Sequence, residues 1–92
     1  MMIYVVKIEK YSVNKESTID SCLYTFETVS YKSAILGTIK NMTTELDGNI
    51  DIKSPQTAIF IPDSEKEEQI LYKLKAYTEQ EYNRYGDPII DF

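Results

Sequence analysis

Hydrophobic and polar residues alternate at the start of the chain, from Met2 to Tyr11, and this period of two predicts a strand. One side of the strand carries Tyr4, Val6 and Ile8. A second alternating run covers about 19–28, and it is also rich in β-branched and aromatic residues. The polar segment 12–18 between the runs predicts a loop. Together the two runs predict an antiparallel hairpin whose connection is longer than the two-residue type.

The period then changes to that of a helix. Ser30 is a good N-cap for a helix that begins at Tyr31, and Gly48 is a natural stop after it. Apolar residues form one stripe along this helix: Tyr31, Ala34, Ile35, Ile39, Met42 and Leu46. Such a stripe predicts that the helix packs on the hairpin with one face.

Two shorter runs follow. Residues 49–53 alternate and predict a short strand, and residues 54–56 predict a turn. Residues 57–61 form the most continuously apolar run of the chain, which predicts a strand in the centre of the sheet. Pro62 is expected to end it.

A second helix is predicted over about 64–85. Its start resembles a capping box, Ser64-Glu65-Lys66-Glu67, and Gly86 and Pro88 provide the stop. At helical spacing, one apolar arc contains Ile70, Leu71, Leu74, Tyr77, Tyr82 and Tyr85. Residues 87–92 are expected to form a tail or a short edge strand.

These elements predict a single α+β domain over residues 1–92. The order is β-β-α-(β)-β-α with a possible short C-terminal strand, and it favours a two-layer sandwich. In this sandwich an antiparallel sheet of three to four strands is covered on one face by two helices. The strand order stays open at this stage.

The residue inventory narrows the chemistry. The chain has no histidine, one cysteine and eight tyrosines. Without imidazole or a second thiol we expect no catalysis, no metal and no cofactor. Cys22 lies on the apolar side of its predicted strand, so we expect a buried, inert thiol. A single cysteine forms no internal disulfide, and no signal peptide or membrane span is recognisable, which predicts a cytoplasmic protein.

The net charge of −5 is unevenly placed. Residues 1–46 carry five acids and five lysines, whereas residues 47–92 carry ten acids and five bases. A phosphate backbone is repelled by such a surface, so direct nucleic-acid binding is not expected. An acidic face instead favours a protein partner with a basic surface. The oligomeric state is not predicted.

The candidate site lies on the predicted second helix. Tyr72 falls opposite the apolar arc, near Glu65, Glu68 and Glu79, and exposed aromatic side chains are typical of protein-binding faces. Glu81 falls near the centre of the arc, where a core rejects a carboxylate. Its position favours a last turn that projects beyond the sheet. Projection would also expose Tyr82 and Tyr85.

The function predicted from these features is a non-enzymatic protein-binding module that uses an acidic, tyrosine-bearing surface. Small acidic single domains are common among phage and mobile-element accessory proteins, which by analogy suggests an inhibitor of a host nuclease or defence complex, similar to anti-CRISPR proteins. The alternative is a sensor or regulatory domain with a ligand pocket lined by tyrosines such as Tyr24 and Tyr77. The tip Ile89–Phe92 resembles the phenylalanine-ending tails of bacterial single-stranded-DNA-binding proteins, but it lacks their preceding aspartates. Packing of this tip on the sheet is favoured over a free binding tail.

Overall fold

The structure is a computed structural model that describes residues 1–42, 48–63, 69–86 and 90. Its elements in chain order are β1 (Met2–Ser12), β2 (Ser17–Thr28), α1 (Tyr31–Met42), β3 (Gly48–Ser54), β4 (Thr57–Pro62), β5 (Ile70–Thr78) and α2 (Glu79–Tyr85). The predicted α+β class is confirmed. The sheet has five strands, however, and not the three to four that the pattern predicted.

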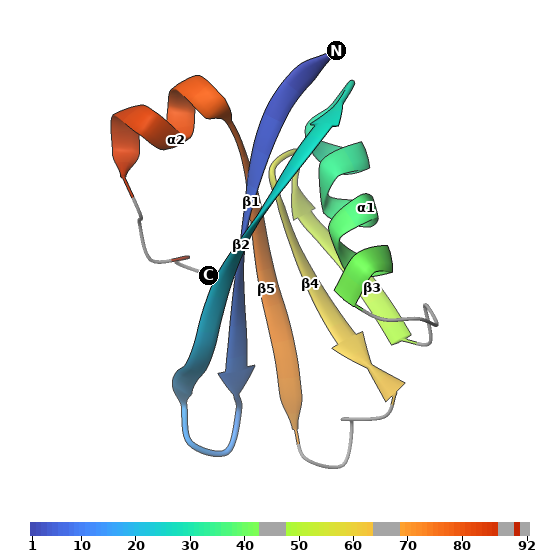
Figure 1. Ribbon diagram of the computed structural model, residues 1–92. Coiled ribbons are helices and arrows are strands. Elements are labelled where there is room, and N and C mark those ends of the chain that lie inside the picture. The colour runs from blue at the N-terminus through green and yellow to red at the C-terminus, as the bar shows by residue number, and fades with distance from the viewer. Residues whose placement is uncertain (43–47, 64–68, 87–89, 91–92) are drawn as a thin grey trace.

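All neighbouring strands are antiparallel, in the order β2-β1-β5-β4-β3 (Figure 1). The predicted hairpin of β1 and β2 is confirmed, and its register pairs Val6 with Tyr24. Its connection is shorter than predicted, because Ser12, Ser17 and Thr18 belong to the strands. β4 was expected at the centre, but it lies between β5 and β3, and β5 occupies the central position.

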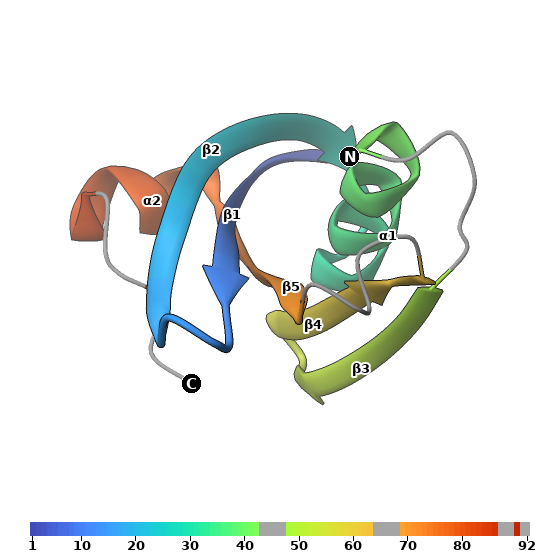
Figure 2. The same cartoon turned by 90° about the horizontal axis from the view of Figure 1, so that it is seen from below.

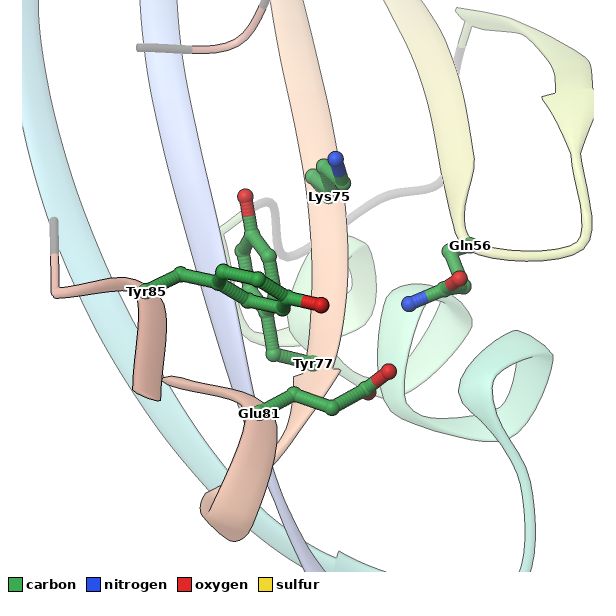
Figure 3. A pocket seen from close by; sticks show the side chains of 5 residues that line it. All are labelled: Gln56, Lys75, Tyr77, Glu81 and Tyr85. Carbon is green, nitrogen blue, oxygen red and sulfur yellow. The ribbon is translucent and has the colours of Figure 1, made fainter. Parts of the chain in front are cut away.

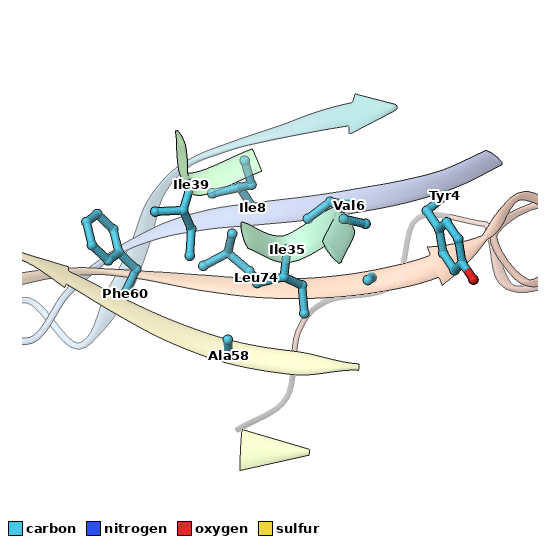
Figure 4. Close-up of a cluster of buried hydrophobic side chains, with 10 residues drawn as sticks. Tyr4, Val6, Ile8, Ile35, Ile39, Ala58, Phe60 and Leu74 are labelled. Carbon is cyan, nitrogen blue, oxygen red and sulfur yellow. The ribbon is translucent and has the colours of Figure 1, made fainter. Parts of the chain in front are cut away.

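The sheet curves around α1, which lies against the concave face (Figure 2). Ser30 caps this helix as predicted, because its hydroxyl accepts the N–H of Ser33 at 3.1 Å. The buried core lies between α1 and the concave face (Figure 4). Its members are Tyr4, Val6, Ile8, Ala34, Ile35, Ile39, Ala58, Phe60, Leu74 and Ala76. The stripes predicted for the first strand and the first helix are therefore confirmed, except Leu46, which lies outside the described residues.

Gly48 has a different role from the predicted helix stop, because it is the first residue of β3. A Cβ atom added to it would lie 2.6 Å from the carbonyl oxygen of Ile61 and 2.6 Å from the ring of Phe60. Only a residue without a side chain permits this close approach of the two strands.

The predicted second helix is wrong over most of its length, because Ile70–Thr78 is the central strand β5. Alternate residues of β5 face α1, and the others point to the convex face. The convex set is Leu71, Lys73, Lys75 and Tyr77. The two lysines place their ammonium groups over tyrosine rings: Lys73 Nζ lies 4.2 Å from the ring centroid of Tyr11, and Lys75 Nζ lies 5.2 Å from that of Tyr77. These cation–π contacts stabilise the two ammonium groups on the convex face of the sheet, where the lysine side chains lie against it.

Helix α2 begins only where β5 ends, and it does not share the face covered by α1 (Figures 1 and 2). The ring of Tyr82 on α2 packs edge-on against Tyr77 on the convex side, with centroids 6.1 Å apart. The predicted sandwich with both helices on one face is therefore wrong. The predicted cap at Ser64 lies outside the described residues.

Of the C-terminal segment 87–92, the structure describes Ile90. This residue is buried, and its N–H donates a hydrogen bond of 3.0 Å to Oε2 of Glu9. Glu9 also lies 3.6 Å from the ammonium group of Lys7, and both side chains are buried on the convex face. The packing predicted for Ile90 is confirmed. In the described part of the chain, no helix has both the length and the apolar character needed to cross a bilayer.

Candidate functional site

The short helix α2 is fixed by polar contacts at both ends. Thr78 is its N-cap: Thr78 Oγ1 accepts the N–H of Glu81 at 3.1 Å, and Glu81 Oε1 accepts the N–H of Thr78 at 2.9 Å. This reciprocal pair is a capping box. At the other end Gly86 has φ 76° and donates its N–H to the carbonyl oxygen of Tyr82 at 2.9 Å. The helix therefore has a defined conformation although none of its residues is buried.

Glu81 also joins α2 to α1. The hydroxyl of Tyr31 donates a 2.7 Å hydrogen bond to Oε1 of Glu81, and the Tyr31 ring packs edge-on against Tyr4 with centroids 5.2 Å apart. The bond to the Glu81 carboxylate, assisted by partial burial, raises the pKa of Tyr31 to about 12. The hydrogen bond that the main-chain N–H of Thr78 donates to the Glu81 carboxylate is the main cause of the lowered pKa of Glu81. At neutral pH the pair is thus a tyrosine hydroxyl that donates to a carboxylate.

A surface pocket of about 360 Å³ lies between α2, β5 and the turn after β3. It is lined by Gln56, Lys75, Tyr77, Glu81 and Tyr85. Figure 3 shows Tyr85 reaching toward Gln56 across the pocket, with Lys75 and Glu81 on the other two sides. The pocket therefore combines two aromatic rings with one cation and one anion.

The wall opposite Tyr85 is held in place by the backbone. The side-chain Nε2 of Gln56 donates to the main-chain carbonyl oxygen of Ala76 at 3.1 Å, and the main-chain carbonyl oxygen of Gln56 accepts the N–H of Ala76 at 2.8 Å. These bonds attach the turn to β5 just beyond the last paired residue of β4, Thr57. Because β4 begins at Thr57, opposite Lys75, the residues of β5 after Lys75 have no partner in β4, and the pocket lies beside them.

The structure separates the predicted site residues. Glu79, Glu81, Tyr82 and Tyr85 lie together on α2, where Glu79 is exposed and Tyr85 is 60 % exposed. Tyr72 does not join them, because it lies on β5 and faces the concave side. It is half-buried, and its ring centroid lies 6.5 Å from that of Phe60. The prediction of an exposed Tyr72 on a helix is wrong. Glu65 and Glu68 lie outside the described residues.

The position of Glu81 is explained by the cap and not by a projecting end of a long helix. The signal for this cap was present in the sequence, because Thr78-Glu79-Gln80-Glu81 has the spacing of a capping box. It was obscured by the similar Ser64–Glu67 pattern and by the assumption that the helix was continuous. Gln56 and Lys75, which sequence reasoning missed, carry no local signal of this kind.

Cys22 is exposed on β2, which corrects the prediction of a buried thiol. It borders a second pocket of about 200 Å³, together with Asp20, Met42 and Tyr72. Partial desolvation, followed by the nearby Asp20 carboxylate, raises the pKa of the Cys22 thiol. A raised pKa is the opposite of what an activated nucleophile needs. Among the described residues, no three histidine, cysteine, aspartate or glutamate side chains are grouped closely enough to hold a metal ion.

Comparisons with models of protein families, with characterised proteins and with solved structures find no match for this chain.

Proposed function

We propose that this protein is a non-enzymatic protein-binding module, and that it contacts its partner through the surface formed by α2 and the adjoining pocket. The observation that carries the proposal is that α2 buries none of its residues and is nevertheless held at both ends. Folding a segment costs conformational entropy, and this helix repays little of it through burial, because Tyr82 is its one ring that packs against a buried residue, Tyr77. A fixed helix that adds little to the core is suited to display side chains.

Tyr85 is the side chain best placed to anchor a partner. It is the described tyrosine with the greatest exposure, and its ring forms one wall of the pocket. Aromatic residues beside a pocket dominate the energetics of many interfaces, because they bury a large area and lose little entropy. A pre-organised helix lowers the ordering cost of binding further.

The expected partner has a basic surface. The chain carries a net charge of −5, and α2 itself has two glutamates and one arginine. Complementary charge increases the association rate more than it strengthens the final complex. Inhibition of a host nuclease or defence complex, in the manner of a phage accessory protein, is the biological setting that this surface would fit by analogy.

The experiment replaces Tyr85 with a photo-crosslinking phenylalanine analogue in the native host and identifies the captured protein by mass spectrometry. Affinity for that protein is then measured with Tyr85→Ala, Glu79→Lys and Ile52→Ala. Ile52 lies on β3, away from α2, and is 47 % exposed, so its variant is the control for the loss of an exposed apolar side chain.

We expect Tyr85→Ala to weaken binding at least tenfold, mainly through faster dissociation, and about 1.4 kcal/mol corresponds to that factor. Glu79→Lys should slow association and reduce its dependence on salt, whereas Ile52→Ala should have no effect. Equal affinity of the Tyr85→Ala and Ile52→Ala variants for the captured protein would refute the α2 surface.

The pocket itself favours a second candidate, the binding of a small ligand. Its volume of about 360 Å³ is within the range of ligand sites, and Tyr77 contributes a ring to it, as the sensor hypothesis expected. Lys75 and Glu81 would recognise a ligand that carries both an anionic and a cationic group. Ligand-observed NMR with a set of amino acids and nucleotides tests this candidate. Binding that survives Tyr85→Ala but is lost with Lys75→Gln would favour the ligand over the protein partner.

A further inference from the structure

Strand β2 is a long edge strand. It spans twelve residues and pairs with β1 alone, and its first seven residues are all exposed. In the described part of the chain, nothing pairs with its outer side. Natural proteins protect such edges with short strands, proline, lysine or inward-pointing charges. Between Ser17 and Thr28, β2 contains no proline, glycine or lysine.

The other edge strand of the sheet, β3, has features that hinder pairing with another strand. β3 has seven residues and carries an exposed ion pair between Lys53 Nζ and Asp51 Oδ2 at 2.7 Å. Pro55 follows it directly. Both edges contain a register irregularity, at Ile19 in β2 and at Lys53 in β3, and β2 also carries Asp20 and Glu27. β2 is nevertheless the longer edge and has no lysine or proline, so it is the edge that is better suited to accept another strand.

Leu23 lies near the middle of β2, and 45 % of it is exposed. Its side chain is on the convex face, opposite Lys7 of β1. An exposed leucine in the centre of a long edge strand marks the point where added contact removes apolar surface from water.

We propose that β2 pairs with β2 of a second copy of the chain, antiparallel and centred on Leu23, so that two five-stranded sheets become one. The sequence of β2 is self-complementary about this centre. Leu23 faces Leu23 of the second copy, Cys22 faces Tyr24, and Ser21 faces Thr25. Backbone hydrogen bonds provide affinity in such a pairing, and the facing side chains select the register.

Charge supports the same centre. The two acids of the strand, Asp20 and Glu27, then lie opposite Phe26 and Ile19 of the second copy, so no like charges face each other directly. The overall charge of −5 on each copy opposes association at long range. Added salt screens this repulsion, so self-association through β2 should become stronger as the salt concentration rises.

The test measures the mass of the purified full chain by sedimentation equilibrium over a wide range of concentration, at low and at high salt. We expect the average mass to rise toward that of a dimer with increasing concentration, and to do so at lower concentration in high salt.

Leu23→Glu and Ile52→Glu are matched variants, because the two residues are 45 % and 47 % exposed and lie on opposite edges. In Leu23→Glu the new carboxylate faces Lys7 within its own sheet, which favours the fold, but meets a second carboxylate at the dimer axis. We expect Leu23→Glu to remain monomeric with an unchanged unfolding temperature, and Ile52→Glu to dimerise as the wild type does.

Cross-linking checks the register. In a Cys22→Ser background, Leu23→Cys should form a disulfide-linked dimer under mild oxidation, because directly opposite residues have Cβ atoms about 5 Å apart. Thr25→Cys should not, because Thr25 faces Ser21 of the second copy. A wild-type chain that is monomeric at every concentration and salt would overturn the proposal, as would dimers that persist in Leu23→Glu. A chain whose β2 amides become protected from exchange only when another protein is added would also overturn it, and would assign the edge to a strand of that protein.

Discussion

Replacing Glu81 with alanine tests whether α2 is held by polar contacts, as the structure indicates. The substitution removes the acceptor of two hydrogen bonds, one from the N–H of Thr78 at 2.9 Å and one from the hydroxyl of Tyr31 at 2.7 Å. A helix cap contributes about 1 kcal/mol, and a hydrogen bond to a charged group about 1.5–3 kcal/mol. Both groups are partly exposed, so solvent screening places the second value at its lower end. We expect Glu81→Ala to lower the free energy of unfolding by about 2 kcal/mol.

The matched control is Glu79→Ala, which removes an exposed carboxylate from the same first turn. Its expected cost is about 0.5 kcal/mol, because only the helix dipole is affected. Urea denaturation of both variants, and of Tyr31→Phe alone and combined with Glu81→Ala, gives a double-mutant cycle. We expect a coupling energy of about 1 kcal/mol between Tyr31 and Glu81. Equal costs for the two glutamate variants, with additive effects in the cycle, would show that the cap and the Tyr31 bond do not hold α2.

The same pair predicts how stability depends on pH. The pKa of Glu81 is lowered from its ordinary value of 4.5, so its contribution is present above that value and is lost as the pH falls through the lower native pKa. The pKa of Tyr31 is raised from 10.0 to about 12, so its contribution is present below 10.0 and is lost as the pH rises toward 12. The difference in free energy of unfolding between the wild type and Glu81→Gln should therefore become smaller at both low and high pH. A difference that is constant across the whole pH range would contradict the assigned hydrogen bonds.

Two further predictions follow from single positions. Gly48→Ala should destabilise the protein by about 1–3 kcal/mol in urea denaturation, because a methyl group would meet the Ile61 carbonyl oxygen at 2.6 Å; no loss of stability would contradict this close approach. Cys22 should react fully with a thiol reagent without unfolding, because it is exposed, but slowly at neutral pH, because its pKa is raised from 9.0. Rapid labelling at neutral pH, or labelling only in denaturant, would contradict one of these two properties.

The parts of the fold that could be predicted from sequence are those whose apolar residues recur at the spacing of one type of element. In β1, the residues Tyr4, Val6 and Ile8 alternate with the residues of the other face, and all three are buried as predicted. In α1, Ala34, Ile35 and Ile39 recur at helical spacing and are also buried. Local periodicity identifies an element when its apolar residues fit the spacing of only one type of secondary structure.

β5 could not be recognised in this way because its apolar residues also fit the spacing of a helix. Its leucine, lysine and alanine residues favour a helix, and Ile70, Leu71 and Leu74 have helical spacing. The structure overrides this preference, since β1 gains a second partner along Tyr4–Ser12 when 70–78 is extended. Pairing with the neighbouring strands thus determined the conformation of residues 70–78, although their local preference is helical.

The candidate site was predicted in part for a related reason. Glu79, Glu81, Tyr82 and Tyr85 were correctly placed on a helix, because the 3.6-residue spacing is valid within that short segment. Tyr72 was wrongly placed with them by extending the same helix across β5. Gln56 joins the pocket because it precedes β4, which begins opposite Lys75, and that pairing depends on the strand order, which could not be predicted.

The effect of salt on binding distinguishes the two proposed interfaces, because long-range electrostatics favour one contact and oppose the other. Contact between this acidic chain and a basic partner at the α2 surface would be attractive at long range, so salt should weaken it mainly by slowing association. Pairing of two β2 edges brings together two chains of charge −5, so salt should strengthen it. Leu23→Glu should abolish the β2 pairing and leave binding at α2 intact, whereas Glu79→Lys changes the net charge of each copy from −5 to −3 and should therefore weaken the salt dependence of both contacts.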